Sequence, residues 1–186
     1  MPNTNDLEIA QLAVDDGTTM AAFVARPARG ANAPGIVVFQ DAFGVNEHFK
    51  DVALRFAAEG FTAIVPELYH RTGTHVQVPF GDVPTARPHS DAITFEMQLA
   101  DTRACYAWLT ANGVAPDRVA AVGYCYGGRV AYMANAAAPF AAAVAYYAAG
   151  LSAPPYLALA EKQHGPILMF WAGRDQHVPR AKARLK

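Results

Sequence analysis

The sequence has few of the features that mark several large classes of protein. Its 186 residues include 15 basic and 16 acidic side chains, which give a net charge of −1, so it carries no basic field that would attract nucleic acid. No apolar run approaches the roughly 18–20 uncharged residues that a membrane span requires. We therefore expect neither a nucleic-acid partner nor a membrane partner.

Cysteine is also scarce, since Cys105 and Cys125 are the only two in the chain. Two cysteines do not form a disulfide framework, and they favour a reducing compartment. The opening stretch MPNTNDLEIA is polar and acidic, unlike a secretory signal, which begins with basic residues and continues with an apolar run. These observations predict a cytoplasmic location.

The chain has ample material for a core, with 53% hydrophobic and 17% charged residues, and its length suits one domain. Residues 7–27 read as two strands around a turn at Asp15, Asp16 and Gly17. Further apolar runs alternate with helical patterns at 46–60, 91–113 and 127–137. The runs that read as buried strands are 35–40, 61–65, 118–123, 140–148 and 165–173. This alternation predicts an α/β fold with a mostly parallel sheet and helices on both faces.

Residues 66–92 interrupt the pattern. Prolines recur there at positions 66, 79, 84 and 88, with glycines at 73 and 81. We expect a long loop, which in a compact domain is often functional, for example as a lid, although an inert surface excursion is the alternative.

The stretch AAVGYCYGGRVAYMANA places Cys125 between a predicted strand and a predicted helix, with Gly123 and Gly127 on either side. This is the thiol form of a nucleophile elbow. The amides at the start of the helix are expected to favour the thiolate, and the amide of Tyr126 to bind a developing oxyanion. The alternative is a small buried cysteine in a glycine-rich turn. The glycine spacing fits no dinucleotide or phosphate-binding loop.

Asp175 follows the apolar run 165–173, which places it at the same edge of the sheet as Cys125. In the order typical of elbow enzymes, the acid follows the nucleophile. Asp175 is therefore our candidate for the catalytic acid. The alternative is an aspartate that caps a turn before Pro179.

Five stretches resemble the dienelactone hydrolase family, the carboxymethylenebutenolidases, from about residue 8 to the end of the chain. They are VVFQDAFGVNEHF, VPELYHRTG, AVGYCYGGRVAY, VAYYAAGL and FWAGRDQHVP. The resemblance implies an α/β-hydrolase fold and a Cys–Asp–His triad. It also implies hydrolysis of a small-molecule ester or lactone through an acyl-thioester. We expect no cofactor. We also expect no metal, since no HExxH spacing or thiolate cluster is present.

The resemblance assigns roles to individual residues. Cys125 becomes the nucleophile and Asp175 the acid of the triad. Ala42, in the stretch QDAFG, supplies the second oxyanion amide beside Tyr126. Asp41 stands where the family has a glutamate that binds the resting thiol.

Tyr146 and Tyr147 match family tyrosines beside the pocket, although core residues at the end of a strand are the alternative. Arg87 lies in roughly the region of the family's carboxylate-binding arginines, but no motif fixes it there.

The family's general base is a histidine in a Gly-His-x-Phe loop, and no such motif follows Asp175. His177 could act only by folding back between Asp175 and Cys125. His70, His75 and His89 would have to reach inward from the proline-rich region. For all of these histidines, a surface position is the simpler expectation.

The sequence is thus interpreted as a single α/β-hydrolase domain over residues 1–186 that lacks the last strand and helices of the family. Such a chain is expected to expose an apolar sheet edge, as a monomer or a homo-oligomer. Two functions remain open. One is a thiol-dependent ester or lactone hydrolase. The other is a catalytically impaired relative that binds a small ligand.

Overall fold

The computed structural model describes residues 7–28, 32–175 and 178. These residues form a seven-stranded sheet in the order β1-β2-β4-β3-β5-β6-β7. The strands are β1 (Glu8–Ala13), β2 (Thr19–Ala25), β3 (Gly35–Phe39), β4 (Thr62–Pro66), β5 (Val119–Tyr124), β6 (Ala142–Tyr146) and β7 (Ile167–Phe170). From β4 to β7 all neighbouring strands are parallel, whereas β2 runs antiparallel to both β1 and β4. The predicted strands and the mostly parallel sheet are confirmed.

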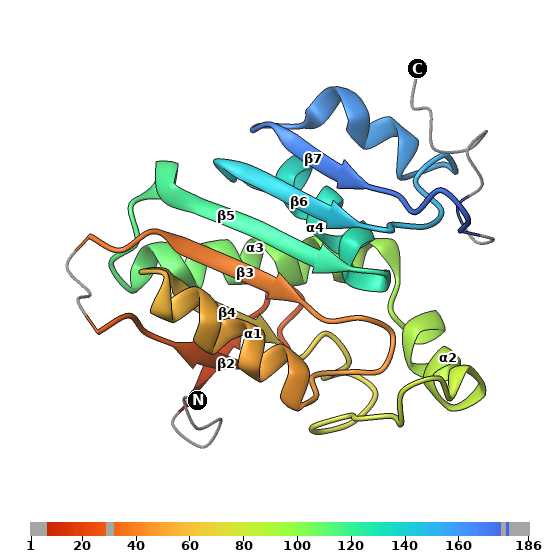
Figure 1. The fold of residues 1–186 in the computed structure, drawn as a ribbon, viewed down its shortest axis with the longest axis horizontal. Coiled ribbons are helices and arrows are strands. Elements are labelled where there is room, and N and C mark those ends of the chain that lie inside the picture. Colours follow the sequence, from red (N-terminus) through yellow and green to blue (C-terminus); the bar gives the residue numbers. More distant parts are fainter. Residues whose placement is uncertain (1–6, 29–31, 176–177, 179–186) are drawn as a thin grey trace.

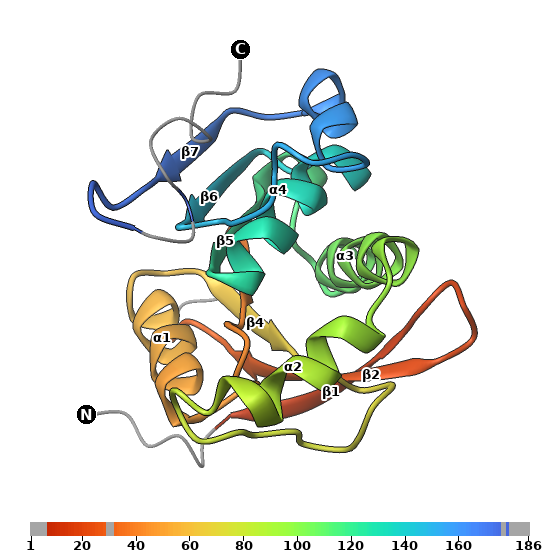
Figure 2. The same ribbon diagram turned by 90° about the vertical axis from the view of Figure 1, so that its right-hand side faces the viewer.

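Helices cover both faces of this sheet, as predicted. The α-helices of the described residues are α1 (Glu47–Ala58), α2 (Val83–Ala92), α3 (Phe95–Ala111) and α4 (Tyr126–Ala137). Figures 1 and 2 show α1 on one face, with α3 and α4 on the other, while α2 lies beyond the end of β3. The helix starts follow local sequence signals. The Asn46 side chain accepts hydrogen bonds from the amides of His48 and Phe49 at the start of α1, and Thr94 caps α3.

The expectation of a loop throughout residues 66–92 was wrong for its second half, which forms α2. The Asp82 side chain caps this helix by accepting a hydrogen bond from the Thr85 amide. Pro84 falls in the first turn, where an amide has no partner in the helix. Pro88 lies inside the helix, and it leaves the carbonyl of Pro84 without an amide donor. Both prolines are exposed, so water can bind that carbonyl.

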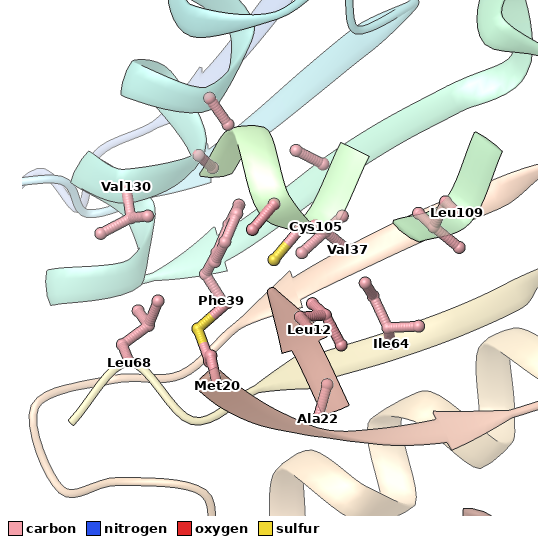
Figure 3. Close-up of a cluster of buried hydrophobic side chains, with 14 of the residues drawn as sticks. Leu12, Met20, Ala22, Val37, Phe39, Ile64, Leu68, Cys105, Leu109 and Val130 are labelled. Carbon is pink, nitrogen blue, oxygen red and sulfur yellow. The ribbon is translucent and has the colours of Figure 1, made fainter. Parts of the chain in front are cut away.

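The larger core lies between the sheet and the pair α3 and α4. Figure 3 shows Cys105 of α3 packed there with Val37 and Phe39 of β3, near Leu109. Cys105 is completely buried, and its place in a helix was predicted. A second core beneath α1 includes Phe49, and both cores end at the carboxyl edge of β3 and β5. The edge that carries the site is therefore supported from both faces.

The far edge of the sheet is less well covered. In β7, Leu168 is 54% exposed and Phe170 is 44% exposed. In the described residues, this edge strand thus presents apolar side chains to solvent. Among them, no helix has the length and apolar character needed to cross a membrane.

Candidate active site

Cys125 sits at a sharp turn between β5 and α4, with φ of 56° and ψ of −113°. A positive φ at a residue with a side chain costs about 1–3 kcal/mol and is typical of functional sites. Three glycines make the turn possible. A Cβ on Gly123 would strike the carbonyl of Gly127, one on Gly127 would strike the carbonyl of Gln40, and one on Gly128 would lie 2.5 Å from the carbonyl of Tyr146.

The same contacts place the turn against its neighbours. Because Gly127 lies against the backbone that follows β3, the start of α4 is next to the loop after β3. The Cys125 amide donates to the carbonyl of Tyr146 at 3.0 Å, which fixes the turn to the end of β6. The backbone of Cys125 is thus held between the ends of β3 and β6.

The Cys125 side chain is exposed, but the surrounding atoms partly desolvate the thiol. This desolvation raises the thiol pKa above its usual value. A hydrogen bond from the Tyr126 amide and the charge of Arg129 lower the pKa, whereas Asp41 and Asp175 raise it further. The net direction is upward, so the expected preference for thiolate is outweighed in this state by desolvation and two carboxylates.

The loop after β3, residues 40–45, carries Asp41 and Ala42 and is called the β3 loop below. The Asp41 carboxylate accepts a hydrogen bond from the Phe43 amide at 2.8 Å, which forms a tight Asx turn. The Ala42 carbonyl accepts from the Tyr69 hydroxyl at 3.1 Å. Its amide has no acceptor within the described part of the chain. Ala42 is therefore held by its carbonyl while its amide remains available to a ligand.

Asp41 is half-buried, and desolvation raises the pKa of its carboxyl group, while the Phe43 amide and the charge of His48 lower it. The charge of Asp41 in turn disfavours ionisation of the Cys125 thiol. Asp41 is one methylene shorter than the glutamate that the resemblance implies, yet its charge reaches the thiol.

Asp175 lies beyond the end of β7, as the sequence indicated. Its Oδ1 accepts a hydrogen bond from the Val178 amide at 3.2 Å, and its own amide donates to the carbonyl of Ala172 at 3.3 Å. Asp175 therefore stabilises a turn, as in the simpler alternative, and its charge also acts on Cys125. His177 lies outside the described residues.

The two tyrosines at the end of β6 lie in different surroundings. Tyr146 is stacked between Tyr124 and Phe170, with ring centroids 5.0 and 4.7 Å away and interplanar angles of 8°. Tyr147 has a φ of 41° and is 42% exposed. Desolvation raises the pKa of its phenol, and the charges of Cys125 and Asp41 add to this. The phenol of Tyr147 thus interacts electrostatically with the Cys125 thiol.

A cavity of about 310 Å³ opens beside these groups. It is lined by Asp41, Asn46, His48, Phe49, Phe80, Tyr124 and Tyr147. Phe80 is 85% exposed and its ring lies 5.2 Å from that of Phe43. Phe80, His48 and Asn46 were not predicted as site residues. Asn46 and His48 lie within the stretch VVFQDAFGVNEHF, which carries the family resemblance, whereas no sequence pattern marks Phe80.

Two of the other described histidines have side-chain partners outside this cavity. His70 Nε2 lies 3.1 Å from Thr18 Oγ1, and His89 Nδ1 lies 2.8 Å from Thr72 Oγ1. None of the histidines in the described ranges is among the groups that shift the Cys125 pKa. Within those ranges, no group of three or more His, Cys, Asp or Glu residues is placed to hold a metal ion.

A sequence model described as "Dienelactone hydrolase family" matches residues 20–186. The chain belongs to this family. It is 36% identical over 172 residues to a candidate carboxymethylenebutenolidase of Salmonella typhi, which covers 88% of this chain and 63% of that protein. A candidate carboxymethylenebutenolidase of Azospirillum brasilense is 36% identical over 187 residues, which cover 96% of this chain and 77% of that protein.

A crystal structure of a candidate dienelactone hydrolase of Klebsiella pneumoniae superposes with a TM-score of 0.82 at 29% identity. The superposition covers 97% of this chain and 79% of that one. The α/β-hydrolase fold of this dienelactone hydrolase-family chain is therefore established. The chain spans 63% of the length of the Salmonella relative.

Proposed function

We propose that this dienelactone hydrolase-family protein hydrolyses a small-molecule ester or lactone with Cys125 as the nucleophile. The observation that carries the proposal is the strained, exposed Cys125 at the start of α4, which directly follows Tyr124, a residue in the lining of a cavity of about 310 Å³. A cavity of this size accommodates a small molecule. The strained turn presents the sulfur at the edge where ligands of such sheets bind.

In the proposed reaction, the Cys125 sulfur attacks the acyl carbon, and the carbonyl oxygen gains negative charge. The amides of Tyr126 and Ala42 stabilise this oxyanion, because both are backbone donors at the same edge. The bond to the alcohol oxygen then breaks, the alcohol leaves with a proton, and an acyl-thioester remains on Cys125. Attack by water on this thioester releases the acid and regenerates the thiol.

The proton transfers need a base, which the family resemblance gives as a histidine oriented by Asp175. None of the described histidines interacts with the thiol. Acylation by an activated ester demands little from a base because its leaving group is stable, but deacylation demands one. The proposal therefore predicts that the acyl-enzyme accumulates and turns over slowly.

The test is a burst assay with an activated aryl ester on protein of confirmed mass, with Cys125→Ala as the loss variant and Cys105→Ala as the matched control. We expect release of about one equivalent of aryl alcohol by the wild type and by Cys105→Ala, followed by a slow phase. Cys125→Ala should show no burst. Equal bursts from wild type and Cys125→Ala would refute Cys125 as the nucleophile.

A second candidate function is binding of a small ligand without turnover. The raised pKa of Cys125 favours it, because a neutral thiol is a poor nucleophile. Acylation separates the two. A burst that Cys125→Ala lacks would support hydrolysis, whereas alkylation of Cys125 by iodoacetamide without any acylation burst would favour a binding role.

A further inference from the structure

The β3 loop is attached to a second segment, residues 75–78, which is called the clamp below. Gly44 forms an antiparallel bridge with Gln77, and the Val78 amide donates to the Phe43 carbonyl at 2.9 Å. The Gln77 side-chain amide donates to the Val45 carbonyl at 2.7 Å. These bonds hold the β3 loop immediately after Ala42.

The contact is close enough to require a glycine. Gly44 has a φ of +88°, and a Cβ at this position would collide with the carbonyl oxygen of Val76. The two backbones therefore lie directly against each other. A shift of the clamp must move the β3 loop, because no side chain separates them that could absorb the change.

The clamp is anchored at its first residue, His75. Its Nδ1 donates to Oε1 of Glu67 at 2.5 Å. Glu67 directly follows β4 and is 6% exposed, and its amide donates to the Ala21 carbonyl of β2 at 2.9 Å. The backbone of Glu67 is thus fixed to the sheet. His75 has a positive φ of 51°, a conformation that a residue with a side chain adopts only when other contacts compensate its cost.

We propose that Glu67 and His75 are positioning residues that hold the β3 loop, and with it the Ala42 amide, where an oxyanion forms at Cys125. The role given to the amide rests on the proposed function. Neither side chain is needed to touch the substrate. Glu67, whose backbone is fixed to the sheet, binds His75 at the start of the clamp. The clamp in turn holds the β3 loop. The Tyr69 hydroxyl on the Ala42 carbonyl is a separate restraint on the same residue.

Two reactions of the same sulfur distinguish positioning from general damage. Acylation by an aryl ester places negative charge on a carbonyl oxygen and uses the oxyanion amides. Alkylation by iodoacetamide displaces iodide from a carbon and leaves no oxyanion to stabilise. The ratio of the two rate constants at Cys125 therefore reports on the amides rather than on the thiol.

The variants are His75→Leu, which removes the donor, and His75→Asn, whose amide nitrogen can replace Nδ1. The matched control is His164→Leu, since His164 is exposed and lies far along the chain. We expect His75→Leu to lower the ratio of acylation to alkylation about tenfold. This is less than the roughly 100-fold loss that follows removal of an oxyanion donor itself. His75→Asn should recover most of the ratio, and His164→Leu should leave it unchanged.

Hydrogen exchange of a peptide that spans residues 40–45 gives a readout that needs no activity. His75→Leu should speed exchange there, and His164→Leu should not. If His75→Leu does not fold, Glu67→Gln provides the same test, because it keeps an acceptor but removes the charge. We expect its ratio to fall more than twofold and its β3 loop to exchange faster.

An unchanged ratio together with unchanged exchange in the folded variant would overturn the proposal. The proposed function fails separately. If no variant and no wild type is acylated, yet His75→Leu still exchanges faster at 40–45, then the clamp positions the β3 loop and the hydrolase assignment is wrong. If acylation occurs but neither readout responds to His75→Leu, the clamp proposal alone is refuted.

Discussion

The two cysteines show how one residue type is directed to two purposes by its backbone. Cys105 lies in the middle of α3, is completely buried, and packs against the sheet in the larger core. Cys125 lies at a strained turn and is exposed. Burial raises the pKa of both thiols, that of Cys105 much more. The difference between a core residue and a candidate nucleophile thus comes from access and backbone geometry, and not from a lowered thiol pKa.

The largest expected difference is in chemical modification. Cys105 reacts only when the core opens, and open states of a stable domain are populated at roughly 10⁻³ or less. Cys125 needs no opening. Iodoacetamide should therefore modify Cys125 at least about a thousandfold faster under native conditions, as peptide mass spectrometry can measure. Comparable rates would contradict the described burial, and both cysteines should become equivalent in denaturant.

Gly127→Ala tests the turn that exposes Cys125. The new methyl group would meet the carbonyls of Phe39 and Gln40, which are backbone atoms that cannot move aside. We expect a loss of about 3 kcal/mol in unfolding free energy, at the upper end for overpacking, and loss of the acylation burst. Chemical denaturation measures the first effect.

Gly60→Ala is the control for that substitution. Gly60 has a φ of +95° but open space around it, so alanine should cost about 1–2 kcal/mol through backbone strain alone and leave the burst intact. If Gly127→Ala is no worse than Gly60→Ala, the close approach of α4 to the β3 loop is not real.

Cys105→Ser tests the core role of the other cysteine. A hydroxyl in this apolar site is expected to cost about 1–3 kcal/mol when no partner satisfies it, whereas Cys105→Ala mainly removes volume. Denaturant midpoints of the two variants give the comparison. Neither should change the rate of acylation at Cys125, and a large change there would show that the two regions are coupled.

The smallest effects concern the charges around Cys125. A raised thiol pKa means less thiolate at neutral pH, so alkylation should keep accelerating with pH above the range of an ordinary cysteine. Asp41→Asn removes a charge that raises this pKa and should speed alkylation at neutral pH by about two- to tenfold. Arg129→Met removes the charge that lowers it and should slow alkylation. If Asp41→Asn slowed alkylation and Arg129→Met accelerated it, the electrostatic account would be contradicted.

Much of this fold could be predicted from the sequence, because its strands are continuous apolar runs separated by clear turn residues. The elbow could also be predicted, since Gly123 and Gly127 flank Cys125 at a strand-to-helix boundary. Helix α2 was missed because its prolines read as breaks, although Pro84 occupies a position that tolerates proline. The roles of Asp175 and Ala42 stay predictions, as does that of Tyr146, which the structure places in an aromatic stack.

Other parts of the site depend on long-range packing and left no local pattern. The pairing of the clamp with the β3 loop joins residues more than thirty positions apart through backbone atoms. Phe80 enters the cavity from a segment without periodicity. The upward shift of the Cys125 pKa depends on groups that are distant in sequence and meet only in the folded chain, including Asp41 after β3 and Asp175 after β7.

The most direct test of the central claim is to locate the acyl group. Protein mixed with an activated aryl ester is quenched at intervals, digested and analysed by mass spectrometry, while the released alcohol is followed optically. We predict one acyl group on the peptide that contains Cys125 and none on the peptide that contains Cys105. The acyl group should appear together with the first equivalent of alcohol and should be lost slowly afterwards. Alcohol release with no acyl group on Cys125, or an unchanged rate in Cys125→Ala, would contradict the account.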